Sequence, residues 1–131
     1  MVSSNLDGLW EIIIIPVPNF LPSVITFLIV STEGRFSLSS DLEGDASSLA
    51  NFHASILKEI KRFDRPIKKP AIIVSSGEAH VKLPKNHGRG GRNSHFALAL
   101  AKEIEGISGI TALAADTDGI DGFEKNAGAI I

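Results

Sequence analysis

The chain has 131 residues, a formal net charge of -2 and an apolar fraction of 44%. This size fits one domain with a hydrophobic core, and the nearly balanced charge excludes the basic surface that general nucleic-acid binding needs. The absence of cysteine excludes disulfides and thiolate chemistry and fits a reducing, cytoplasmic interior.

Residues 1–35 form the most apolar part of the sequence. The runs "IIIIPVP" and "FLPSVITFLIV" are broken by prolines, and neither reaches the roughly 18 uninterrupted apolar residues of a membrane span. No Lys or Arg precedes Arg35, so the basic start of a secretory signal is missing. The β-branched content predicts buried strands, and no membrane partner is expected.

A long amphipathic helix is predicted from Leu42 to Phe63, directly after Asp41. Its apolar residues recur at three- and four-residue steps, and Pro66 ends the pattern. We expect His53 to lie on the surface of this helix. The predicted apolar stripe consists of Leu49, Phe52, Ile56, Ile60 and Phe63.

Further elements follow in chain order. "AIIVSSG" predicts a buried strand that runs into a glycine turn, and "AHVKL" alternates like a second strand. "SHFALALAKEIEG" predicts a helix, because Phe96, Leu100 and Ile104 repeat at steps of four. "ITALAA" and "NAGAII" predict two more strands. This order indicates an α/β domain with a mixed sheet and flanking helices.

The first candidate loop is "GRGGRN". Its glycines allow close backbone approach to a ligand, and the helix that follows directs unpaired amides and the positive end of its dipole at the same place. An anion site is therefore one hypothesis. A solvated glycine turn, with Asn93 or Ser94 capping the helix, is the other. The candidate residues here are Arg89, Gly90, Gly91, Arg92 and Asn93.

The second candidate loop is "DTDGIDG", which places Asp116, Asp118 and Asp121 on one turn. Their mutual repulsion is costly unless a cation, a proton or a polar ligand shares the site. One aspartate could hold Mg²⁺, and another could accept a proton or a hydroxyl hydrogen bond from a substrate. An exposed loop screened by water is the alternative. Glu78, in "SSGEAHV", could lie beside both loops or on an exposed turn.

The sequence resembles a known family in four motifs. "SDLEGDA", "SSGEAHV", "GRGGRNSHFALALA" and "ALAADTDGIDGFEKNAGAII" occur in the order of the motifs of the MOFRL domain, the C-terminal domain of type II glycerate kinases. Members of that family are often called hydroxypyruvate reductases. The resemblance covers residues 36–131, whereas residues 1–35 do not resemble the family. Where the family tends to read "GGETTV", this chain reads "SGEAHV".

The resemblance implies an ATP-dependent kinase that converts D-glycerate to 2-phosphoglycerate in a cleft shared with a Rossmann-like N-terminal domain. It implies that Arg92 binds a carboxylate or the transferring phosphate, and that Asp118 or Asp121 orients the hydroxyl. Asp116 and Asp118 are the candidate ligands for Mg²⁺. The remaining residues expected to bind substrate or phosphate are Glu78, Arg89, Gly90, Gly91, Asn93 and Asp116.

The Rossmann-like domain has no counterpart in these 131 residues. We therefore expect a partial MOFRL-like domain that is truncated at its C-terminus and inactive without its missing half. A stand-alone anion- or metabolite-binding module and an inactive folded fragment are the alternatives. Hydroxypyruvate reductase activity is a weaker alternative, because no dinucleotide fingerprint is present. Whether the partner is the missing domain or a second copy is left open.

Overall fold

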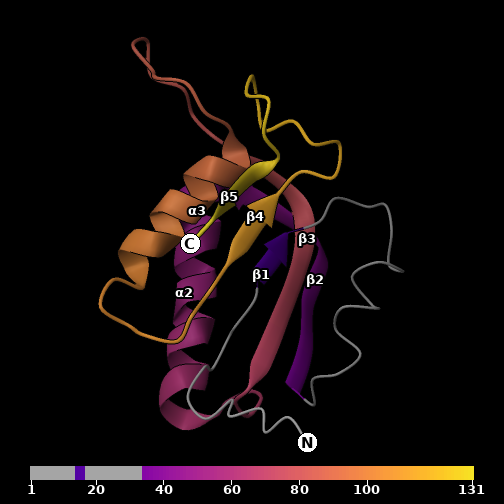
Figure 1. Cartoon of the computed structure of the whole chain (residues 1–131), viewed down its shortest axis with the longest axis vertical. Helices are drawn as coiled ribbons and strands as arrows, with labels where there is room; N and C mark the ends of the chain where they lie inside the picture. Colours follow the sequence, from indigo (N-terminus) through magenta and orange to yellow (C-terminus); the bar gives the residue numbers. More distant parts are fainter. Residues whose placement is uncertain (1–13, 17–33) are drawn as a thin grey trace, which may run out of the picture.

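The computed structural model describes residues 14–16 and 34–131 (Figure 1). The predicted α/β class is confirmed, whereas the strands predicted elsewhere in residues 1–33 lie outside the described residues. The elements are β1 (Ile14–Pro16), β2 (Gly34–Asp45), α2 (Ala46–Phe63), β3 (Ala71–His80), α3 (Arg92–Glu103), β4 (Leu113–Ala115) and β5 (Gly128–Ile130).

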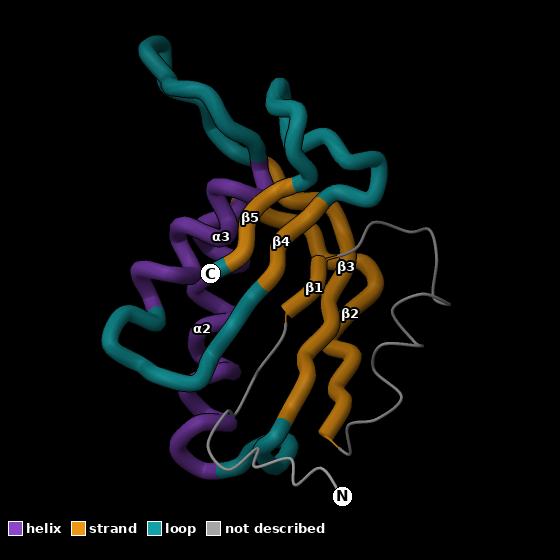
Figure 2. The backbone as a smooth tube through the Cα atoms, viewed as in Figure 1, coloured by secondary structure: helices purple, strands orange, loops and turns teal. Residues whose placement is uncertain are grey.

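The described strands form a parallel three-stranded sheet in the order β1-β3-β2 and an antiparallel pair, β4-β5. β4 lies beside β1, and α2 and α3 pack against each other on the same side of the strands (Figure 1). The loops 81–91 and 116–127 project from one end of the molecule (Figure 2). β2 and β3 end there and both helices begin there, so the fold brings the two candidate loops together.

The first helix begins at Ala46, not at Leu42 as the pattern predicts, because residues 34–45 form β2. The side chain of Asp45 accepts a hydrogen bond from a backbone amide in the first turn at 3.0 Å. Asp45 therefore caps the helix. The pairing of β2 with β3 extends the strand through positions that sequence periodicity assigns to the helix.

The buried face of α2 differs from the predicted stripe. Phe52 and Phe63 are 47% and 57% exposed, whereas His53, predicted on the surface, is buried. Small side chains allow α2 to pack closely against its neighbours, so burial on this helix follows shape more than hydrophobic size. The buried residues of α2 are Ala46, Ala50, His53, Ala54, Leu57 and Ile60.

β3 is one continuous strand, and the turn predicted at Gly77 is absent. A Cβ atom at Gly77 would overlap the backbone of Leu42 on β2. The register of β2 against β3 shifts between Ser39 and Leu42, which is a bulge in β2. Gly77 therefore permits the close approach of the bulged strand and does not end β3.

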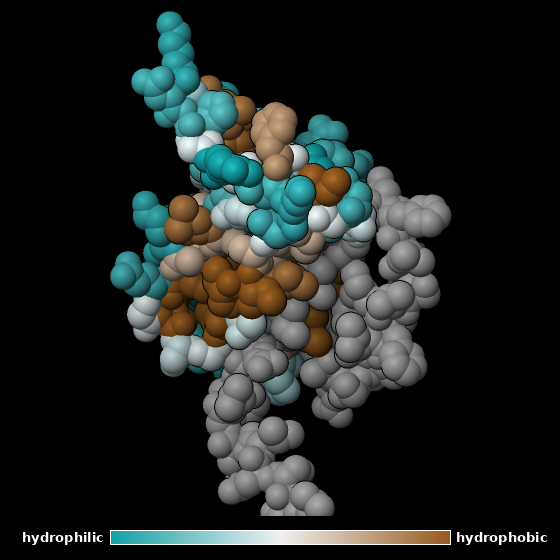
Figure 3. Space-filling model, turned by 45° about the horizontal axis from the view of Figure 1, so that its top comes forward, coloured by the Kyte–Doolittle hydropathy of each residue, from teal (hydrophilic) through white to brown (hydrophobic). Residues whose placement is uncertain are grey.

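The C-terminal half follows the predicted pattern more closely. Phe96, Leu100 and Ile104 are buried, as predicted, and they pack in the core with Ala112 and Ala114. Hydrophilic residues dominate the end that carries the loops, and a hydrophobic surface lies below them (Figure 3). Among the described helices, none is long and apolar enough to cross a membrane.

Candidate functional site

The glycine-arginine loop and the aspartate turn are in direct backbone contact. A Cβ atom at Gly91 would overlap the carboxyl group of Asp121. A Cβ atom at Gly122 would lie 2.8 Å from the Gly90 carbonyl oxygen, and Gly122 also has a φ of 66°. Glycine at positions 91 and 122 is thus required by close approach, which joins the two loops into one site.

Asp121 caps α3 from a distant part of the chain. Its side chain is fully buried, Oδ1 accepts the backbone amide of Asn93 at 2.8 Å, and Oδ2 accepts the amide of Ser94 at 2.8 Å. The Ser94 hydroxyl also donates to Oδ2 at 2.5 Å. The helix itself offers no side-chain cap, because Gly91 occupies the N-cap position.

This contact corrects two expectations from the sequence. Asn93 or Ser94 was the expected cap in the alternative without an anion, but both residues instead donate to the capping group, Asp121. The amides at the start of the helix were expected to be unpaired, but those of Asn93 and Ser94 are occupied by the protein's own carboxylate. A ligand anion therefore has to be bound through other donors.

Arg92 and Asp116 form the centre of the site. Arg92 donates from Nε to Asp116 Oδ2 at 3.2 Å and from Nη2 to Oδ1 at 2.9 Å. Asn93 Nδ2 adds a hydrogen bond to Oδ2 at 2.8 Å. The hydrogen bonds to Asp116 raise the pKa of Arg92, so its guanidinium group stays positively charged.

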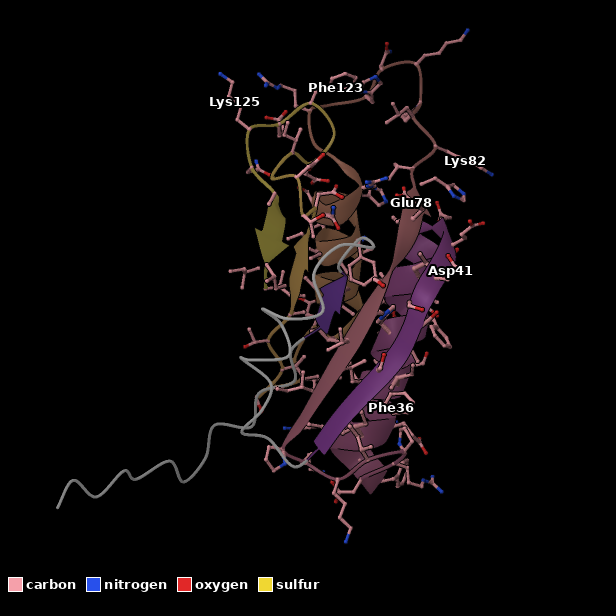
Figure 4. The ribbon with its side chains drawn as sticks, turned by 90° about the vertical axis from the view of Figure 1, so that its right-hand side faces the viewer. Phe36, Asp41, Glu78, Lys82, Phe123 and Lys125 are labelled. Atoms are coloured by element: carbon pink, nitrogen blue, oxygen red, sulfur yellow. The ribbon has the colours of Figure 1, made fainter. Side chains whose placement is uncertain are left out.

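Glu78 reaches the same arginine from β3. Its Oε2 accepts a hydrogen bond from Arg92 Nη1 at 2.5 Å. Figure 4 shows Glu78 near the loop end of β3, with Lys82 farther along the chain. Glu78 therefore contacts the arginine that ends the glycine-arginine loop, and it stands on a strand and not on a turn.

Two other predicted site residues lie outside this cluster. Arg89 pairs with Glu124 at 2.8 Å and is itself 83% exposed. Asp118 is exposed, and its Oδ1 accepts the Ile120 amide at 2.9 Å within the turn. In the described part of the chain, no group of three or more His, Cys, Asp or Glu side chains is arranged to hold a metal ion.

A buried histidine beneath the site was not predicted. His53 Nδ1 lies 2.7 Å from the Leu49 carbonyl oxygen, which can only accept, so Nδ1 carries the proton and Nε2 accepts from the Ser75 hydroxyl at 2.8 Å. Burial lowers the pKa of His53, which favours this neutral form. His53 and Ser75 line a cavity of about 40 Å³ together with Arg92 and Asp116. The alanines at positions 46, 50 and 54, four residues apart, share this buried face, but alanine is only weakly hydrophobic and gives little signal in the sequence.

The fold and the site define an α/β domain in which an aspartate turn fixes a glycine-arginine loop. Residues 71–131 match the model of the MOFRL family.

Similar proteins carry two kinds of name. A D-glycerate 2-kinase from Thermotoga maritima is 44% identical over 94 residues, which cover 72% of this chain and 22% of the relative. A protein from Agrobacterium vitis, provisionally named a hydroxypyruvate reductase, is 45% identical over 95 residues, with the same two coverages of 72% and 22%. This chain thus spans less than a quarter of the length of these relatives.

A solved structure agrees with the sequence matches. The crystal structure of glycerate kinase from Thermotoga maritima superposes with a TM-score of 0.76 at 39% identity. The match covers 81% of this chain and 26% of that protein. The arrangement of elements described above therefore resembles that of the matched part of the Thermotoga maritima protein.

Proposed function

We propose that this chain supplies part of the active site of an ATP-dependent glycerate 2-kinase, which transfers a phosphoryl group from ATP to the 2-hydroxyl of D-glycerate. The similarity to glycerate 2-kinases supports the reaction class. The observation that carries the proposal is the position of Arg92, which donates two hydrogen bonds to Asp116 and is thereby held at the loop end of the domain.

The reaction requires positioning and charge neutralisation more than covalent chemistry from the protein. The hydroxyl oxygen of glycerate forms a bond to the γ-phosphorus of ATP, the bond to the bridging oxygen of ADP breaks, and the hydroxyl proton passes to a base. A fixed guanidinium group suits this chemistry because it can orient a carboxylate or stabilise the charge on the transferring phosphoryl group. We assign this role to Arg92.

The aspartates take different roles in this proposal. Asp121 is a positioning residue, because both of its carboxylate oxygens are committed to the start of α3. Asp116 fixes Arg92. Asp118 is the one of the three that is exposed, and its carboxylate is the kind of oxygen ligand that Mg²⁺ accepts. Mg²⁺ would neutralise charge on the ATP phosphates.

Residues from beyond this chain are needed for turnover in this proposal. The matched relatives are about four times longer than the aligned region, which covers 22% of the Thermotoga maritima enzyme. Among the described residues, Arg92 is the cation that pairs with both Glu78 and Asp116. Phosphoryl transfer uses several positive charges around the phosphates. We therefore assign substrate binding to this chain and full catalysis to its combination with a second domain.

The test combines binding with turnover. Calorimetry with D-glycerate and 2-phosphoglycerate is expected to give saturable binding, and an ADP-release assay with ATP, Mg²⁺ and D-glycerate is expected to stay at background. Absence of binding for both ligands would contradict the proposed function. Robust ADP release would show that no second domain is needed, and protein-dependent oxidation of NADH by hydroxypyruvate would favour the reductase alternative.

A further inference from the structure

We infer that the Glu78 carboxylate occupies an anion-binding position on Arg92, and that a ligand carboxylate or phosphate displaces it by binding Arg92 through two oxygens. Glu78 would then restrain binding and would not itself contact the anion. This inference rests on the proposed function only for the identity of the natural ligand.

The donors of Arg92 define the place of exchange. A guanidinium group has five N–H donors. Asp116 accepts from Nε and from Nη2, and Glu78 accepts from Nη1. The edge formed by Nη1 and Nη2 therefore becomes available for a two-point contact once Glu78 leaves. Carboxylates and phosphates both match that edge.

The two carboxylates on Arg92 are held with unequal strength. The side chain of Asp116 is 6% exposed and is also bound by Asn93 Nδ2. The side chain of Glu78 is 65% exposed, and its bond to Arg92 is a surface ion pair. Surface ion pairs contribute little because water replaces them readily, whereas breaking a buried pair leaves an uncompensated charge. An incoming anion therefore displaces Glu78 and leaves Asp116 in place.

The surroundings of Glu78 give the exchange a direction. Glu78 and Arg92 line an open groove, so the ligand can arrive from solvent. Glu43 on β2 lies directly across the sheet ladder from Glu78 and lines the same groove. Like charges in directly opposite positions repel, which favours the Glu78 contact with Arg92 when no ligand is bound. With Glu78 in place, two carboxylates surround one guanidinium group, and the site disfavours a third anion.

Calorimetry with inorganic phosphate tests the exchange. We expect Glu78→Gln to bind phosphate about fivefold more tightly than the wild-type chain, because the competing charge is gone. Glu43→Gln is the matched control, since it removes the same charge from the opposite strand position without removing the ion pair. The affinity of Glu43→Gln for phosphate is expected to differ from that of the wild-type chain by less than about twofold. Circular dichroism verifies that both variants are folded.

Several results would overturn the inference. They are unchanged or weaker phosphate binding by Glu78→Gln, equal tightening by Glu43→Gln, and no phosphate binding by any of the proteins. A second readout uses the wild-type chain: phosphate is expected to shift the carboxyl ¹³C resonance of Glu78 more than that of Glu43, and an unmoved Glu78 resonance would also contradict exchange. A parallel titration with D-glycerate separates the two proposals, because phosphate exchange without glycerate binding would contradict only the proposed function.

Discussion

Arg92 and Asp116 are joined by two hydrogen bonds, from Nε to Oδ2 at 3.2 Å and from Nη2 to Oδ1 at 2.9 Å. The pair connects the start of α3 to the residue that follows β4. Because Asp116 is buried whereas the Arg92 side chain is 35% exposed, the pair contributes to stability as well as to the shape of the site.

Asp116→Asn is expected to lower the free energy of unfolding by about 2 kcal/mol. This figure lies below the range for a fully buried pair because water partly screens Arg92. Urea denaturation followed by circular dichroism measures the loss. Glu124→Gln, which removes the half-buried partner of the exposed Arg89, is the control and should cost less than about 1 kcal/mol. Equal losses in the two variants would contradict the importance of Asp116.

Asp121→Ala removes the cap of α3 and leaves the buried amide of Asn93 and the partly buried amide of Ser94 without their acceptor. We expect a loss of about 2–4 kcal/mol, which combines the cap with the cost of the unsatisfied donors. Asp118→Ala is the matched control on the same turn, and its exposed side chain predicts a loss below about 1 kcal/mol. Thermal or urea unfolding gives both values. If Asp121→Ala unfolds with the same free energy as the wild-type chain, the aspartate turn does not stabilise the start of α3.

Gly91→Ala tests the contact between the two loops. The added methyl group would overlap the Asp121 carboxyl group, so the loops must separate, at a cost of about 2 kcal/mol or more. Gly88→Ala is the control, because no atom lies within 4 Å of a Cβ at that position. The free energy of unfolding of the control is expected to lie within about 0.5 kcal/mol of the wild-type value. Similar stability of both variants would contradict the close approach.

His53 predicts a pH dependence of folding. Burial lowers its pKa below the ordinary value of 6.5, so the unfolded chain takes up the proton first as the pH falls. The stability that neutral His53 contributes is complete above about pH 6.5 and declines below it. His53→Gln should therefore flatten the stability profile between about pH 7 and about pH 5. His87→Gln, in an exposed loop, should keep the wild-type slope, and equal slopes in all three proteins would contradict the prediction.

Local pattern predicted the helices and strands that depend on large apolar residues. The spacing of Phe96, Leu100 and Ile104 places α3 correctly, because large side chains at one helical face pack against the core. The same reasoning placed Ile60 correctly, but it put the exposed residues Phe52 and Phe63 on the buried face of α2 and missed the burial of His53. Close packing there uses alanines, whose weak hydrophobic signal does not mark a face.

The candidate site was predictable in composition but not in pairing. The glycine, arginine and aspartate motifs predicted the residues of the cluster, Arg92, Asp116 and Asp121, but also Arg89 and Asp118, which lie outside it. Which aspartate serves which role depends on contacts between positions 28 and 24 residues apart, as in the bonds from Asn93 to Asp121 and from Arg92 to Asp116. The role of Gly77 was likewise not predictable from local sequence, because glycine is needed there to make room for the neighbouring strand β2.

The most direct test is the affinity of Arg92→Lys for 2-phosphoglycerate, measured by calorimetry beside Arg89→Lys. Lysine keeps the charge but loses the planar fork, so Arg92→Lys is expected to weaken binding about tenfold or more. Arg89 pairs with Glu124 and does not contact Arg92 or Asp116. Its replacement should therefore change the affinity for 2-phosphoglycerate less than about twofold. An unchanged affinity in Arg92→Lys, or equal losses in both variants, would contradict the assignment of substrate binding to Arg92.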